Sequence, residues 1–175
     1  MKTGVFARGR IIWLGLILLL WSVWLYMTRS KKLNHPQKMS IISNTGLALF
    51  NDLQTVGKFT PEMARLLVAQ AAHETGNFTS QLFKEQNNLF GMRHPRIRKT
   101  YSIGEKSGHA VFASVQDSIK DYKIYHTVFN YLPFYSSVST FVEALASRGY
   151  FTAPKEEYKR GVSYFYDLYF SENGK

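Results

Sequence analysis

The pattern of apolar and charged residues divides the chain near residue 28. Residues 11–27 carry no charged side chain and are almost wholly apolar, with Trp13, Trp24 and Tyr26 near the two ends. As a helix this stretch would span about 26 Å, close to the thickness of a bilayer core. A basic sequence follows it instead of a small-residue cleavage site. We therefore predict an uncleaved membrane anchor over residues 1–28, then a basic linker over 29–42.

From residue 43 onward, apolar positions recur at helical spacing, with one weakly alternating stretch. Thr60, Pro61 and Glu62 have the N-cap, first-turn proline and acidic residue that begin a helix. The alternating stretch contains two glycines and predicts a small hairpin. We expect an α+β, predominantly helical domain over 43–175, with helices over about 47–56, 61–75, 138–148 and 155–169, a helix opening at a Ser114–Asp117 capping box, and a hairpin within 99–113.

Composition and charge narrow the classes of function. The chain has no cysteine, which excludes disulfides and cysteine metal sites. The net charge is +10, but residues 1–40 hold seven basic and no acidic residues, so the later residues carry only 15 basic against 12 acidic side chains. A nucleic-acid-binding domain would carry its basic patch on the folded part. We therefore expect no nucleic-acid partner.

Glu74 is the first candidate for chemistry. It falls at the predicted end of an apolar helix, where the helix dipole disfavours a second negative charge. Burial among apolar neighbours would disfavour that charge further. Both effects raise a carboxyl pKa, as a general acid at neutral pH requires. Position alone is equally compatible with a solvated glutamate at a helix end.

A second candidate segment follows at Asn87–Met92. Its two amides, Asn87 and Asn88, could pair with the N-acetyl and hydroxyl groups of a sugar, and Phe90 could offer a flat apolar face. A capped loop with a core phenylalanine is the structural alternative. We expect these three residues to bind substrate. His73 and Glu74 also begin like a zinc-protease motif, but residue 77 is Asn, so we expect no metal and no cofactor.

Four motifs in order resemble those of the bacterial glucosaminidase family of peptidoglycan hydrolases, over about residues 60–170. The motif with Glu74 resembles the family's Ala-Gln-Ala-Ala-x-Glu-[Thr/Ser]-Gly, which carries its catalytic glutamate, and the second resembles Asn-Asn-Leu-Phe-Gly-Ile. The matching stretches are Ala69–Gly76, Asn87–Met92, Val111–Tyr122 and Gly149–Pro154. The resemblance implies a lysozyme-like fold, with a helical lobe and a small β-hairpin lobe separated by a groove.

Two departures from the family pattern concern acidic residues and charge. The last motif usually contains an aspartate where this chain has Ala153, and the loop over 93–99 is unusually basic. In the family a second carboxylate, where one is proposed, lies on the hairpin, and Glu105 is the acid found there. Glu105 could activate a water for inversion. Alternatively Glu105 is a surface residue, the substrate's own acetamido group assists, and Tyr150 steadies the transition state.

The resemblance implies a glycoside hydrolase that cleaves β-1,4 bonds of peptidoglycan as an endo-β-N-acetylglucosaminidase, and the uncharged segment over 11–27 would anchor it in a membrane. Glu74 would be the acid, with Tyr150 and Asn88 shaping the subsite. Its partners would be the glycan strand and, through residues 11–27, a lipid bilayer, with the catalytic domain facing the cell wall. Three alternatives stay open: cleavage after N-acetylmuramic acid, a phage or virion lytic enzyme in a virion membrane, and a non-catalytic wall-binding or assembly module. Charge does not fix the membrane orientation.

Overall fold

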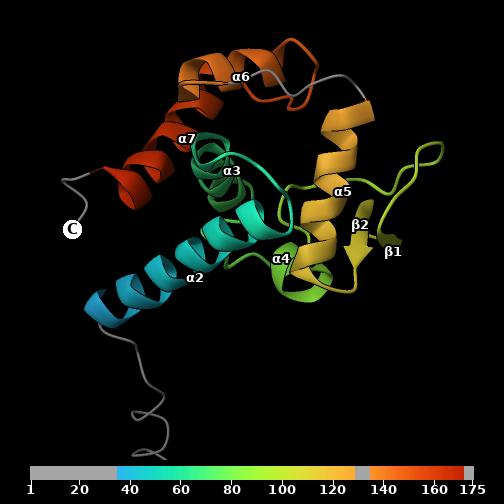
Figure 1. Cartoon of the computed structure of the whole chain (residues 1–175), viewed down its shortest axis with the longest axis horizontal. Coiled ribbons are helices and arrows are strands. Elements are labelled where there is room, and N and C mark those ends of the chain that lie inside the picture. The colour runs from blue at the N-terminus through green and yellow to red at the C-terminus, as the bar shows by residue number, and fades with distance from the viewer. Residues whose placement is uncertain (1–34, 129–134, 172–175) are drawn as a thin grey trace, which may run out of the picture. The chain divides into compact units, whose positions relative to one another are not determined.

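The computed structural model describes residues 35–128 and 135–171 of the chain, and this part is mostly helical with one two-stranded sheet. The α+β class expected from the sequence is therefore confirmed at this level (Figure 1). The elements in chain order are α2 (His35–Thr55), α3 (Pro61–Glu74), α4 (Gln81–Gln86), β1 (Ser102–Lys106), β2 (His109–Phe112), α5 (Val115–Val128), α6 (Val138–Ala146) and α7 (Lys155–Phe170).

Local capping chemistry sets the helix ends that the sequence predicted. The Thr60 hydroxyl accepts a hydrogen bond from the Met63 N–H at 3.3 Å, and Pro61 opens α3. The Ser114 hydroxyl accepts from the Asp117 N–H at 3.1 Å, which begins α5. Both predicted starts are confirmed, because a side-chain oxygen here satisfies an N–H that the helix itself leaves unpaired.

Two elements differ from the expected pattern. Helix α2 begins at His35, so the residues from 35 to 42 of the predicted linker are helical. The short helix α4 was not predicted, because six residues are too few to establish a helical period. Its ends are set locally by a Ser80 N-cap and by Asn87 in the left-handed conformation (φ 51°).

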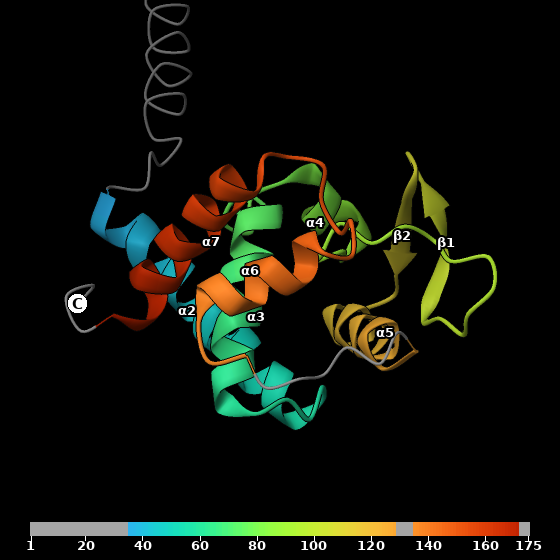
Figure 2. The ribbon, with the colours of Figure 1, turned by 90° about the horizontal axis from the view of Figure 1, so that it is seen from above.

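Helix α3 forms the centre of the folded part. Nearly all of its residues from Met63 to Ala72 are buried, including the small Ala69, Ala71 and Ala72. Helix α7 packs against α3, and α6 packs against α7. Figure 2 shows these helices together, with α5 and the hairpin on the other side of α3. Because these side chains of α3 are small, the neighbouring helices can pack closely against it. The C-terminal end of α3 therefore lies among the elements that surround it.

The hairpin is antiparallel and turns tightly at Ser107 and Gly108. Both residues have positive φ, 53° and 77°, which suits the two-residue turns that match strand twist. The register pairs Glu105 with Ala110 and is irregular between Ser102 and Gly104. The predicted hairpin is thus confirmed.

The predicted anchor over residues 11–27 lies outside the described residues. Within the ranges that the structure does describe, no helix has the length and apolar character needed to cross a bilayer.

Candidate active site

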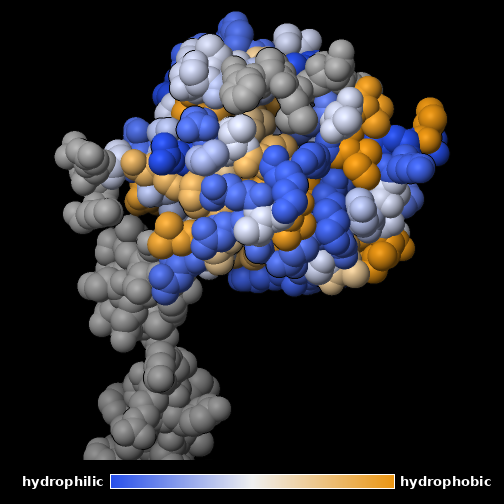
Figure 3. Space-filling model, in the orientation of Figure 1, coloured by the Kyte–Doolittle hydropathy of each residue, from blue (hydrophilic) through white to orange (hydrophobic). Residues whose placement is uncertain are grey.

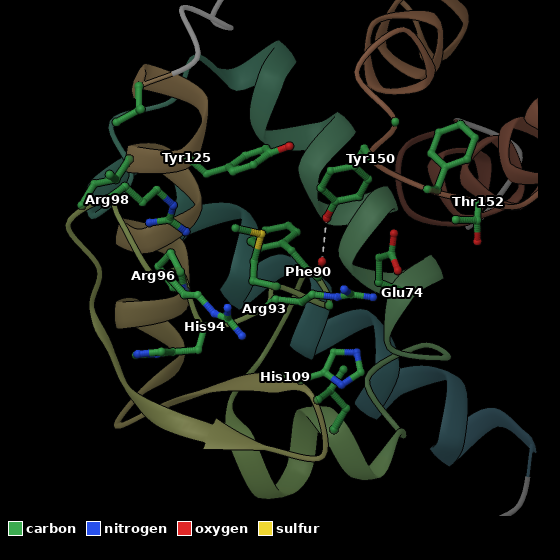
Figure 4. Close-up of a pocket in the computed structure, with 18 of the residues that line it drawn as sticks. Glu74, Phe90, Arg93, His94, Arg96, Arg98, His109, Tyr125, Tyr150 and Thr152 are labelled. Carbon is green, nitrogen blue, oxygen red and sulfur yellow. Dashed lines mark hydrogen bonds between the residues drawn. The ribbon is translucent and has the colours of Figure 1, made fainter.

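A cavity of about 1520 Å³ opens at the C-terminal end of α3. Its walls come from segments far apart in the sequence: the loop over 90–99, one side of α5, the segment over 149–153 between α6 and α7, and the start of α7. Glu74 and Tyr150 face the 93–99 loop across this space (Figure 4). A cavity of this size exceeds the usual range for one small ligand and suits an oligomer.

Glu74 lies in the wall of the cavity as the last residue of α3, partly exposed. Burial raises the pKa of its carboxyl above the ordinary value, and a hydrogen bond from the Tyr158 hydroxyl at 2.6 Å lowers it in part. The net direction is upward, so the protonated form persists to higher pH than in a solvated glutamate. Such a carboxyl can deliver a proton to a bound ligand.

A buried chain of hydrogen bonds holds the carboxylate in position. Tyr122 donates to the Gln70 side-chain oxygen at 2.7 Å, the Gln70 amide donates to the Tyr158 hydroxyl at 3.4 Å, and Tyr158 donates to Glu74. Gln70 and Tyr122 are completely buried. The chain of contacts therefore links α5, α3 and α7 to one carboxylate oxygen and fixes its direction.

Gly91 and Tyr150 shape the approach to Glu74. A Cβ atom on Gly91 would lie 3.6 Å from the second Glu74 oxygen, and the residue has a φ of 62°. The positive φ would strain any other residue here, and a Cβ atom would be in ordinary van der Waals contact with the carboxylate. The Tyr150 hydroxyl donates to the Phe90 carbonyl at 2.6 Å, which ties the 149–153 segment to the same loop (Figure 4). Burial raises the pKa of Tyr150, so it stays protonated.

The side-chain amides of Asn87 and Asn88 form hydrogen bonds with the backbone in this structure. Asn87 donates to the Phe112 carbonyl at 3.0 Å. Asn88 is fully buried, donates to the carbonyls of Met92 and Ala110, and accepts from the Met92 N–H. In this structure both N–H groups of Asn88 are used to fix the loop, so a contact of Asn88 with sugar stays a prediction.

Phe90 also lies differently from expectation. Its ring is 2% exposed and stacks on Tyr122, with centroids 3.9 Å apart. Phe90 is thus almost wholly buried, although it is among the residues that line the cavity. Besides Tyr150, the partly exposed Tyr125 and Phe151 line the cavity, and the sequence analysis did not single out these two as site residues. Phe151 stacks on Tyr158 at 3.8 Å.

The remaining predicted acid, Glu105, lies apart from the cavity lining. It is exposed on β1, whereas Glu74 is the acidic side chain among the described residues that line the cavity. Ala153 lines the cavity. An aspartate at this position, which is usual in the family that the sequence resembles, would therefore add a second carboxylate to the cavity wall. Across the described ranges, no three His, Cys, Asp or Glu side chains are grouped to hold a metal.

Replacing Tyr158 with phenylalanine should raise the pKa of Glu74 further. The hydroxyl stabilises the carboxylate form, so its loss favours the protonated form. A carbon-13 NMR titration of the Glu74 carboxyl measures the shift. Tyr164→Phe on the exposed side of the same helix is the control and should leave it unchanged. An unchanged or lower Glu74 pKa in Tyr158→Phe would show that the hydrogen bond does not tune it.

Comparisons with known proteins identify a family for this chain. A family model described as mannosyl-glycoprotein endo-beta-N-acetylglucosaminidase matches residues 51–169, which include Glu74, Tyr150 and Tyr158. A curated relative, "Protein bax" of Escherichia coli, is 39% identical over 72 residues. That match covers 41% of this chain and 25% of the relative's length. No solved structure matches the chain.

Proposed function

This chain belongs to the mannosyl-glycoprotein endo-beta-N-acetylglucosaminidase family, and on that basis we propose that it hydrolyses the glycan strand of peptidoglycan. The bond proposed is the β-1,4 link after N-acetylglucosamine. The observation that carries the proposal is Glu74, a carboxyl of raised pKa held by a buried hydrogen-bond chain in the wall of a large cavity. Release of soluble fragments from purified peptidoglycan by the full-length chain tests for turnover, and no release would favour a non-catalytic wall-binding module.

The proposed reaction uses a single protein carboxylate. Glu74 donates its proton to the glycosidic oxygen as the bond to C1 breaks. The carbonyl oxygen of the substrate's acetamido group forms a bond to C1 from the opposite face and gives a cyclic oxazolinium. Water then attacks C1, the bond from C1 to the oxazolinium oxygen breaks and restores the acetamido group, and the water's proton passes to the Glu74 carboxylate, which restores the acid. Tyr150 stays protonated and holds the wall beside the reacting sugar.

The alternative with two protein carboxylates requires Glu105 to reach the scissile bond. Its exposed position outside the cavity lining supports the substrate-assisted route instead. We expect Glu105→Gln to retain near-normal hydrolysis, and Tyr150→Phe to lose more because the bond to Phe90 is lost. Initial rates of reducing-end release measure both. A Glu105→Gln variant as impaired as one without Glu74, and rescued by azide, would instead identify Glu105 as the base.

For location, we propose that residues 1–28 anchor the protein in a membrane, with the domain from residue 43 facing the cell wall. The support is the uncharged stretch over 11–27. Carbonate-resistant membrane association of the full-length protein should disappear when residues 1–39 are removed. A full-length protein that fractionates as soluble, or a mature N-terminus beyond residue 28, would contradict the anchor.

A further inference from the structure

The loop over residues 93–99 gives the cavity a strongly positive wall. Arg93, Arg96, Arg98 and Lys99 all line the cavity, and the acidic side chain that lines it within the described ranges is Glu74. Glu74 must be protonated, and therefore neutral, to act as an acid. A cavity with one sign of fixed charge concentrates ligands of the opposite sign. A neutral glycan offers these cations hydrogen-bond acceptors but no group of opposite charge.

Not all of these cations are free to bind a ligand. Arg98 forms a bidentate ion pair with Asp121, with N–O distances of 3.0 and 2.7 Å. The Arg98 side chain is only 10% exposed. Arg93 and Arg96 are exposed, and no carboxylate within the described ranges pairs with either of them. Arg93 extends along the cavity toward Glu74 (Figure 4). Arg98 therefore supports the loop. Arg93, Arg96 and the exposed Lys99 at the end of the loop are available to a ligand, and of these Arg93 and Arg96 carry guanidinium groups.

The loop is held at several points, so these two arginines project from a fixed base. The Met92 carbonyl accepts hydrogen bonds from Asn88 and from the Ala110 N–H, each at 2.8 Å. His94 contacts the Ser102 hydroxyl at 2.9 Å, and Arg98 is bound to Asp121. Arg93 and Arg96 lie between these anchors. Ordering the loop in advance lowers the entropy cost of binding an anion.

We propose that Arg93 and Arg96 form an anion subsite that selects glycan strands carrying free carboxylates on their peptide stems. This inference rests on the proposed function and specifies the substrate of the same cavity. Guanidinium groups suit carboxylates because they can donate two parallel hydrogen bonds. The exposed tip of the loop also carries Ile97, and exposed apolar side chains stand among hydrophilic ones at this edge of the molecule (Figure 3). Because both arginines line the cavity itself, the substrate is the favoured occupant over a membrane.

The test compares two forms of one polymer with the full-length chain in neutral detergent. One form is peptidoglycan freed of phosphate polymers, and the other is the same material with its carboxylates converted to methylamides. The wild type should bind and cleave the native form better, and added salt should shrink the difference. In Arg93→Gln/Arg96→Gln, kcat/KM on the native form should fall roughly 3- to 10-fold, mainly through KM, and should be unchanged on the methylamide form.

The matched control removes two positive charges elsewhere. Arg65 and Arg160 are exposed and do not line the cavity, so Arg65→Gln/Arg160→Gln should bind the native form normally. An Arg93→Gln/Arg96→Gln variant that loses equal affinity for both polymers would overturn the proposed subsite. Equal losses of affinity in the two double variants would overturn it as well. Co-sedimentation with the insoluble polymers needs no turnover, so it decides the question even if hydrolysis is absent and the proposed function fails. A loss confined to binding of phosphatidylglycerol vesicles would assign the loop to a membrane and also overturn it.

Discussion

Replacing Glu74 with glutamine is expected to lower peptidoglycan hydrolysis by at least about 10²-fold, and by up to about 10⁴-fold. The amide keeps the volume of the side chain and can still accept the hydrogen bond from Tyr158, but it has no acidic proton to deliver. Rates of reducing-end release measure the loss. Glu62→Gln, at the exposed opposite end of α3, is the matched control and should keep full activity.

The same substitution should not weaken the fold at neutral pH. Because burial raises the pKa of Glu74 in the folded protein, its favourable contribution is present below the unfolded pKa and is lost as pH rises through the folded pKa. Removing the titrating group therefore leaves stability at pH 7 equal or higher. A correctly folded Glu74→Gln protein with near-normal turnover would refute the catalytic assignment.

Replacing Asp121 with asparagine should destabilise the fold by about 3–5 kcal/mol, the usual result of breaking a buried ion pair. Asp121 is fully buried and accepts hydrogen bonds from Arg98, from the Thr100 hydroxyl and from the Tyr101 N–H. Urea unfolding of the full-length chain in detergent measures the change. Glu143→Gln, which breaks the exposed pair with Lys155, is the control and should have little effect.

The pH dependence gives a second check on this pair. Burial alone would raise the pKa of Asp121, but the bonds from Arg98, Thr100 and Tyr101 hold it below the usual range. The stabilisation is therefore present above the unfolded pKa of about 3.9 and is lost as pH falls through the folded value. Arg98→Met/Asp121→Asn should be more stable than Asp121→Asn alone, because no charge is left buried without its partner while the asparagine oxygen can still accept from Thr100 and Tyr101. A double variant that is less stable would contradict this account.

The sequence predicted the features that depend on neighbouring residues. The Thr60 cap, the proline after it and the Ser114 capping box act within one turn, so their side chains identify them directly. The turn at Ser107 and Gly108 is local in the same way. The helix predicted over about 61–75 placed Glu74 at its end, and α3 does end at Glu74.

Features that depend on contacts distant in the sequence could not be predicted. Tyr158 lies 84 residues from the Glu74 carboxyl to which it donates, and its surroundings in the sequence show only an amphipathic helix. Asn88 and Phe90 look suited to binding sugar, yet the packing of the loop turns both inward. The helices and strands that pack around a loop set the direction of its side chains. The residue pattern within the loop does not show which helices and strands these are.

The most direct test of the account is the identity of the sugar at the newly formed reducing end. Purified peptidoglycan is digested with the full-length chain, reduced with borohydride and analysed by mass spectrometry. We expect the reduced ends to be N-acetylglucosaminitol, and we expect Glu74→Gln to produce none. Reduced ends of N-acetylmuramitol would contradict the proposed bond, and an absence of new reducing ends with the wild-type chain would contradict the hydrolase assignment itself.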